Sequence, residues 1–325
     1  MPIQNTAKIL SPSSASNTGN FIPQFMKRKH HSSFRARSDS EASASSGSES
    51  DHGEGSERTC TLHSSTKTGT KHSNNEDTYI ATFDVAASTK RKGSNTAALF
   101  AVFDGHGGGF CSKYLKENFL FHLMNQNLDL EAGVEEAEMK FCKRARRNCD
   151  DSGACLIACM ISQDNEYFVA GVGDCRCVLS VGFGAKRKVR ALSRDHTARS
   201  ELARIRRAGG YVSNGRVAGI LEPARTIGDL DVKDEANSGL IATPEMKKGK
   251  IEPGALHIFV LASDGLWDVM SNKDAICLIE KHIRDRKGKP SKQIADSKNL
   301  TSFLVQEAFN KGSSDDITAL VCIVW

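Results

Sequence analysis

Short apolar runs separated by turn residues recur from about residue 59 to the C-terminus. Runs of this length, bounded by Gly, Asp and Ser, are typical of β-strands. They predict strands at residues 78–86, 97–103, 154–162, 166–173, 177–182, 188–193, 211–219, 257–263 and 317–325. Several runs follow one another directly, as in residues 166–193, which favours antiparallel pairing over a doubly wound parallel sheet.

Helical periodicity separates some of these runs. Residues 110–126 place Leu115, Phe119 and Leu123 one turn apart, and residues 272–283 place isoleucines on one face, as amphipathic helices do. The sequence therefore predicts an α+β fold. We expect a central antiparallel β-sandwich of two sheets flanked by helices, in α-β-β-α layers.

The N-terminal residues have a different composition. Ser, Asn, Gly and charged residues dominate, without a strand-like or helical apolar period. We expect a disordered Ser-rich tail over residues 1–58 and one domain over residues 59–325. Ser38 stands between Arg-Ala-Arg and Asp-Ser-Glu, so it is a candidate for regulatory phosphorylation. Residues 27–31 (KRKHH) fit a nuclear localisation patch or, more simply, a solvated charge run.

Composition argues against several classes of protein. The apolar runs are far shorter than the roughly 18 residues of a membrane span, and no secretory signal precedes them. We therefore expect no membrane partner and an intracellular location, cytoplasmic and/or nuclear. The 10 cysteines are scattered without zinc spacing, which favours buried thiols. The net charge is +5, but the basic stretches lie far apart, so we expect no nucleic-acid binding.

An Asp-Gly pair follows two of the apolar runs. Asp104-Gly105 and Asp264-Gly265 could each form a hairpin turn. Each pair, however, leads into a helical pattern instead of the return strand that a hairpin needs. Asp174 also follows an apolar run, and there a strand does return, so an ordinary turn remains open.

Two acid pairs, Glu76-Asp77 and Asp315-Asp316, also border apolar runs. Carboxylates that strand ends bring together repel one another unless a cation neutralises them. Oxygen ligands with few histidines favour Mg²⁺ or Mn²⁺ over Zn²⁺. The sequence thus predicts a site for hard divalent cations at the strand ends.

These segments resemble those of the metal-dependent serine/threonine protein phosphatases of type 2C. The resemblance rests on NNEDTY, FAVFDGHGG, GVGDCR, LSRDHTARSELARIRRAGGYV, GRVAGILEPARTIGD, FVLASDGLWDV and SSDDIT, in this order. It covers about residues 66–325. The β-sandwich that it implies agrees with the predicted strand order.

The resemblance implies a binuclear Mg²⁺ or Mn²⁺ centre that activates water to hydrolyse phosphoserine and phosphothreonine. Asp104 would bridge the two ions, and His106 would protonate the leaving oxygen. The other implied ligands are Gly105 through its carbonyl, Asp264 and Asp315, with Glu76 and Asp77 orienting metal-bound waters.

A weaker third metal is implied at Asp150, with Asp268 as a helper. Asp151 is adjacent and could replace Asp150. Either acid could also be an ordinary charged residue at the end of a loop.

Other charged residues of the matching segments favour structural roles. Asp174 and Asp229 are expected to hold loops through backbone hydrogen bonds. Glu201, Arg204 and Arg207 lie at i+3 spacings that suit a surface ion-pair row on a helix ending at glycine.

Two positions depart from the resemblance where they matter for chemistry. His72, with Lys71 beside it, stands where the family usually has an arginine that grips the substrate phosphate. Because a histidine is only partly charged near neutral pH and lacks the bidentate fork, weaker phosphate binding is expected. Asp316 replaces an asparagine and adds negative charge near the ions.

The favoured hypothesis is an active phosphatase that acts on phosphorylated proteins, and we expect it to be a monomer. The alternative is a weakly active or inactive phosphatase-like scaffold that binds phosphoproteins, motivated by His72 and the tail. A metal-dependent nuclease is the weakest of the three hypotheses.

Overall fold

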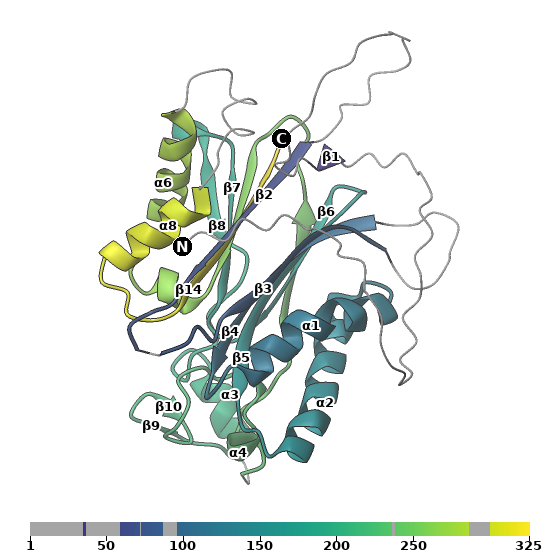
Figure 1. The fold of residues 1–325 in the computed structure, drawn as a ribbon, viewed down its shortest axis with the longest axis vertical. Coiled ribbons are helices and arrows are strands. Elements are labelled where there is room, and N and C mark those ends of the chain that lie inside the picture. The colour runs from purple at the N-terminus through teal and green to yellow at the C-terminus, as the bar shows by residue number, and fades with distance from the viewer. Residues whose placement is uncertain (1–34, 37–58, 72, 87–95, 236–237, 286–299) are drawn as a thin grey trace, which may run out of the picture.

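The computed structural model describes residues 35–36, 59–71, 73–86, 96–235, 238–285 and 300–325. Ser38, His72 and residues 27–31, which carried three of the sequence-based expectations, lie outside this part. Within it, two sheets face each other and helices cover their outer sides (Figure 1). The predicted α-β-β-α sandwich is confirmed.

One sheet has the strand order β12-β6-β5-β4-β3, and β11 pairs with Gly153 and Ala154 at the start of β5. All of these strand pairs are antiparallel. The strands are β3 (Thr78–Ala86), β4 (Thr96–His106), β5 (Gly153–Ser162), β6 (Glu166–Val172), β11 (Ile227–Gly228) and β12 (Glu245–Lys250).

The other sheet has the order β1-β2-β14-β13-β7-β8. Its pairs are antiparallel except the short parallel pair of β1 with β2. The strands are β1 (Arg35–Ala36), β2 (Thr59–Lys67), β7 (Arg176–Val181), β8 (Lys188–Ala191), β13 (His257–Ala262) and β14 (Ile317–Val324). A separate hairpin joins β9 (Val212–Ser213) to β10 (Arg216–Val217).

Helices α1 and α2 lie against the first sheet, and α5, α6 and α8 lie against the second (Figure 1). The bounds are α1 (Phe110–Asn125), α2 (Leu130–Asn148), α3 (Leu202–Arg207), α4 (Leu230–Lys233), α5 (Asp264–Trp267), α6 (Asn272–Arg284), α8 (Leu300–Asn310) and the short 3₁₀ helix η1 (Gly184–Lys186). No helix in the described ranges is both long and apolar enough to cross a membrane.

The apolar run of β4 is continuous because both faces of the strand are buried. Leu99 and Phe103 point into the layer beneath α1 and α2, whereas Phe100 and Val102 point between the two sheets. All four side chains are fully buried. Alternate side chains of a strand point to opposite faces, so one run fills two layers of the core.

The predicted helices over 110–126 and 272–283 are confirmed as α1 and α6. Strands β2 and β12 and helices α2 and α8 were not predicted. Strand β12 is polar and is recognisable only from its pairing with β6. The buried face of α2 mixes large apolar residues such as Val134 and Phe141 with small ones such as Gly133 and Ala137.

Residues 173–175 connect the two sheets. Strand β6 belongs to one sheet and β7 to the other, so Asp174 is not at the turn of a hairpin. This crossing brings Asp174 to the end of the sandwich where β4 and β13 also end.

Candidate metal centre

The centre is built on the end of β4. Asp104 and Gly105 are paired with β5 opposite Cys155 and Ala154. A Cβ atom added to Gly105 would lie 2.5 Å from the Glu76 carbonyl oxygen, so only glycine lets the segment carrying Glu76 approach the strand this closely. The strand then enters the glycine loop that precedes α1.

Asp104, Asp174 and Asp264 converge at this end of the sandwich. One carboxylate oxygen from each lies within 4.8 Å of the others. Asp264 is the first residue of α5, directly after β13. Asp174 was expected to hold a loop rather than bind metal, and the structure places its carboxylate in this cluster. Its place depends on the crossing between the sheets.

Burial and mutual repulsion make the cluster unfavourable without a cation. Burial, followed by the charge of Asp264, raises the pKa of Asp104 well above its ordinary value. Burial and the charge of Asp174 raise the pKa of Asp264 to about 8. Burial also raises the pKa of Asp77 to about 7. A divalent cation would remove this repulsion and keep the acids ionised.

The donor atoms fit a hard divalent cation. All cluster donors are carboxylate oxygens, which Mg²⁺ and Mn²⁺ prefer. Among the described residues, no hydrogen-bond partner satisfies the buried Oδ1 of Asp77. Its Oδ2 accepts a hydrogen bond of 2.9 Å from the Ser263 hydroxyl, which fixes the carboxylate beside Asp264.

Glu76 is held at the site by Asp316. Its Oδ1 accepts a hydrogen bond from Gly69 N and its Oδ2 accepts one from Glu76 N, each at 2.8 Å. The carboxylate of Glu76 in turn accepts from Gly108 N at 3.2 Å. Asp316 therefore acts as a backbone clamp between two chain segments, a role that its sequence position did not indicate.

Lys71, an expected phosphate-binding residue, pairs with Asp315, an expected metal ligand. Lys71 Nζ lies 2.7 Å from Asp315 Oδ2. This hydrogen bond raises the pKa of Lys71. Asp268 follows α5 close by and is exposed at the surface, and partial desolvation of its carboxylate, followed by the charge of Glu222, raises its pKa. These residues form the more exposed side of the centre.

Asp150 lies at the end of α2 beside the start of α1. Its Oδ1 accepts hydrogen bonds from the backbone N of Ser152 at 3.0 Å and from the Ser152 hydroxyl. The Ser152 hydroxyl oxygen also accepts from Cys111 N at 3.0 Å. Asp151 is exposed. The structure thus gives Asp150 a place in the loop, and a third metal there remains a prediction.

His106, whose side chain is partly exposed, pairs with the buried carboxylate of Asp229. Its Nε2 lies 2.9 Å from both carboxylate oxygens of Asp229. Burial lowers the pKa of His106, but the hydrogen bond and charge of Asp229 outweigh it, so the pKa is raised. Asp229 was expected to hold a loop, and the sequence did not indicate that its carboxylate contacts His106.

The Asp229 carboxylate occupies space that a side chain at residue 153 would need. A Cβ added to Gly153 would lie 2.0 Å from Asp229 Oδ2. Gly153 opens β5 opposite His106 in β4. The absence of a side chain there allows Asp229 to reach the histidine.

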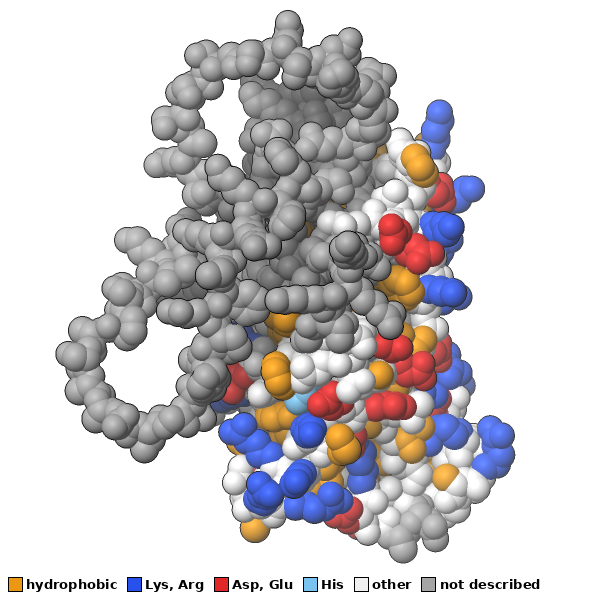
Figure 2. All heavy atoms as spheres, turned by 90° about the vertical axis from the view of Figure 1, so that its right-hand side faces the viewer, with side chains coloured by type: hydrophobic (Ala, Val, Ile, Leu, Met, Phe, Trp, Pro, Cys, Tyr) orange, Lys and Arg blue, Asp and Glu red, His pale blue; other side chains and the backbone are white. Residues whose placement is uncertain are grey.

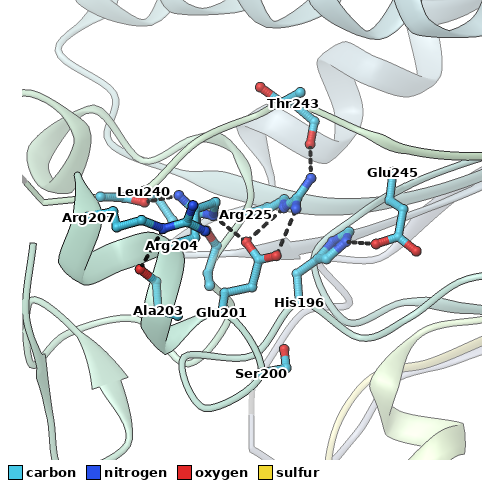
Figure 3. Close-up of polar contacts among 12 residues, drawn as sticks. His196, Ser200, Glu201, Ala203, Arg204, Arg207, Arg225, Leu240, Thr243 and Glu245 are labelled. Carbon is cyan, nitrogen blue, oxygen red and sulfur yellow. Dashed lines mark hydrogen bonds and ion pairs between the residues drawn. The ribbon is translucent and has the colours of Figure 1, made fainter.

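A second polar network supports the crossing segment that carries Asp174 (Figure 3). His196 is fully buried. Its Nδ1 accepts a hydrogen bond of 3.2 Å from Gly173 N, and its backbone N donates to the Gly173 carbonyl at 2.9 Å. Nε2 therefore carries the ring proton and points to Glu245 Oε2 at 3.4 Å. His196 clamps the residue directly before Asp174.

Glu201 is buried beside this clamp, so the expected surface ion-pair row was wrong. The side chain of Glu201 is 3% exposed and accepts from Arg225 at 2.7 and 2.9 Å and from Arg204 (Figure 3). Arg207 instead donates to the Ala203 carbonyl. Glu201 directly precedes α3, which carries Arg204 and Arg207, and tertiary contact with Arg225 holds Glu201 inward.

Converging carboxylates beside a histidine–aspartate pair are typical of metal-dependent hydrolases. Comparisons with known proteins specify the family. Residues 61–317 match the family described as "Protein phosphatase 2C". The chain belongs to this family of metal-dependent serine/threonine protein phosphatases, which confirms the resemblance found in the sequence.

Curated relatives come from plants. "Probable protein phosphatase 2C 59" of Arabidopsis thaliana is 34% identical over 235 residues, covering 69% of this chain and 68% of that relative. "Probable protein phosphatase 2C 71" of the same plant is 33% identical and covers 69% of this chain but 48% of that relative. The chain thus spans from about half to about two thirds of these relatives.

Solved structures share the fold. A sex-determining protein of C. elegans superposes with a TM-score of 0.67 at 24% identity, covering 81% of this chain and 64% of that chain. Serine-threonine phosphatase 2C from Toxoplasma gondii superposes with a TM-score of 0.56 at 20% identity, covering 81% of this chain and 99% of that chain. At these identities the likeness supports the fold alone.

Proposed function

We propose that this chain hydrolyses phosphoserine and phosphothreonine in proteins at a binuclear Mg²⁺ or Mn²⁺ centre. The observation that carries the proposal is the convergence of Asp104, Asp174 and Asp264, with carboxylate oxygens within 4.8 Å of one another. Their raised pKa values mark a site that lacks compensation from the protein itself. A pair of hard cations supplies that compensation.

The metal ligands proposed from the family resemblance are Asp104, the Gly105 carbonyl, Asp264 and Asp315, and the structure adds Asp174 as a candidate. Glu76 and Asp77 orient water at the centre. When bound, the cations lower the pKa of water and offset the negative charge of the phosphoryl group. Asp150 and Asp268 are the proposed acids of a weaker third site.

His106 is the proposed general acid for the leaving serine or threonine oxygen. The Asp229 carboxylate holds Nε2, so the proton that can reach the substrate is on Nδ1. Asp229 also favours the charged imidazolium before transfer. Lys71 is proposed to release Asp315 to a metal ion and to attract the substrate phosphate together with His72.

The test is hydrolysis of a phosphothreonine peptide by the full chain with Mn²⁺. We expect turnover by the wild type and a loss of at least about 100-fold in kcat/KM for Asp104→Asn. Asp164→Asn, an exposed acid in the turn between β5 and β6, serves as the matched control. Mn²⁺ binding in calorimetry without turnover would replace the proposal with the phosphoprotein-binding scaffold.

A further inference from the structure

A basic surface lies on the two helices that border the proposed metal centre. Helix α1 starts directly after the glycine loop of β4, and α2 ends two residues before Asp150. The surface, called here the α1–α2 basic face, consists of Lys113, Lys116, Lys140, Lys143, Arg144 and Arg147, all exposed. Figure 2 views the molecule from the side on which these helices lie, and Lys and Arg side chains (blue) are frequent on its lower half.

The positions on α2 share one side of the helix. Lys140, Lys143, Arg144 and Arg147 are spaced i, i+3, i+4 and i+7, which places them on one face. The acids of α2, in contrast, occupy its N-terminal half up to Glu138. Acids near the N-terminus and basic residues near the C-terminus of a helix interact favourably with its dipole. The dipole of α2 does not explain, however, why the positive surface continues onto α1.

Contacts between the helices direct the basic face toward the centre. The guanidinium of Arg144 lies 5.2 Å from the ring centre of Phe110, the first residue of α1. Lys113 Nζ folds back over the glycine loop, 3.3 Å from where a Cβ of Gly109 would be. The α-carbon of Glu76 lies 3.9 Å from the same point. The charge of Lys113 therefore lies close to the segment of Glu76, which is proposed to orient water.

The charges of the face are left for a partner. Across the described ranges, no carboxylate forms an ion pair with any of its six side chains, whereas neighbouring Arg146, on another side of α2, pairs with Asp234. Stacking on Phe110 also leaves the edge of the Arg144 guanidinium available for hydrogen bonds. A negatively charged segment would complete this surface.

We propose that the α1–α2 basic face binds acidic residues flanking the phosphorylated serine or threonine of a protein substrate. The proposal rests on the proposed function and names its substrate class. The phosphate enters the centre, and Asp or Glu residues next to it in the substrate contact α1 and α2. Electrostatic attraction at an exposed surface contributes to selectivity and to the rate of association.

The experiment compares three substrates of the full chain with Mn²⁺: a phosphothreonine peptide flanked by Asp and Glu, the same peptide with Asn and Gln, and p-nitrophenyl phosphate. The variant is Lys143→Gln/Arg147→Gln. The control, Lys188→Gln/Lys281→Gln, removes two exposed charges from β8 and α6 on the other side of the sandwich. Circular dichroism establishes that both variants fold.

We expect the wild type to prefer the acidic peptide, and the preference to fall about fivefold in the variant but not in the control. It should also weaken in 0.5 M NaCl, because screening shortens the Debye length to roughly 4 Å. An equal effect of the variant on all three substrates, or no preference in the wild type, would overturn the proposal.

Failure of the proposed function has a different signature, namely that the wild type hydrolyses none of the three substrates. The basic face is then judged by fluorescence anisotropy with the labelled acidic peptide alone. Binding that weakens about fivefold in the variant supports the face as a docking surface. Equal binding by the wild type and the variant rejects it.

Discussion

Replacing Glu201 by glutamine tests whether the buried charge network beside the metal centre stabilises the fold. The carboxylate of Glu201 accepts two hydrogen bonds from Arg225 and one from Arg204, whose side chains are 12% and 23% exposed. Glutamine keeps the shape of the side chain. It removes the negative charge and directs an amide N–H group toward a guanidinium, which also donates.

The size of the effect follows from the pKa of the carboxylate. Burial alone would raise it, but the hydrogen bonds and charges of Arg225 and Arg204 lower the pKa of Glu201 from 4.5 to about 2. A shift of this size corresponds to at most about 3 kcal/mol. Solvent screens part of it through the half-exposed Arg194, so we expect Glu201→Gln to lower the free energy of unfolding by about 2 kcal/mol at pH 7.

The pH dependence has a defined sign. The folded pKa lies below the unfolded value, so the stabilisation is complete above about pH 5.5 and is lost as the pH falls toward 2. The difference between the wild type and Glu201→Gln should therefore shrink by about a third to a half between pH 7 and pH 3.5.

Urea unfolding followed by tryptophan fluorescence measures this difference, with EDTA present so that metal binding does not contribute. Arg207→Gln, at the end of α3, is the control, because Arg207 is exposed and its guanidinium donates to a backbone carbonyl. It should change stability by less than about 0.5 kcal/mol. A Glu201→Gln effect no larger than that of the control, or one that is constant from pH 7 to pH 3.5, would refute the reasoning.

Substitutions at three further positions separate the roles of the residues around the centre. Asp229→Asn should lower kcat on a phosphothreonine peptide by about 10- to 100-fold, because it removes the carboxylate that pairs with His106. Mn²⁺ affinity in calorimetry should stay unchanged. An unchanged kcat would exclude a role of the His106–Asp229 pair as general acid. In EDTA, Asp264→Asn should unfold at a temperature no lower than that of the wild type, because the substitution removes a buried like charge. The variant should also lose the rise in melting temperature that Mn²⁺ gives the wild type. A lower melting temperature of the variant in EDTA contradicts the argument that the carboxylates repel one another. His196→Ala should weaken Mn²⁺ affinity about tenfold, because it releases Gly173. His196→Asn keeps an acceptor for the Gly173 N–H group and should retain the affinity. Equal affinities of the wild type and His196→Ala would show that the contact of His196 with Gly173 does not act on the metal centre.

Local pattern accounts for the parts of the fold that could be predicted. The runs in β4 and β13 are apolar throughout because both faces are buried, and the helical pattern after each Asp-Gly pair separated the strand ends from hairpins. Helix α2 was missed because small residues such as Gly133 and Ala137 form much of its buried face. Polar β12 was missed because its strand character comes from pairing with β6.

The sequence by itself determined the order of the elements, the position of acidic residues at strand ends and the family, since these depend on local periodicity and on motifs. Tertiary structure alone decided which charged groups meet. His106 and Asp229 are 123 residues apart, and Asp174 joins the cluster through a crossing between sheets. Glu201 is buried because Arg225 arrives from another segment. Burial, and with it the pKa of a side chain, is set by neighbours distant in sequence, and no local pattern records them.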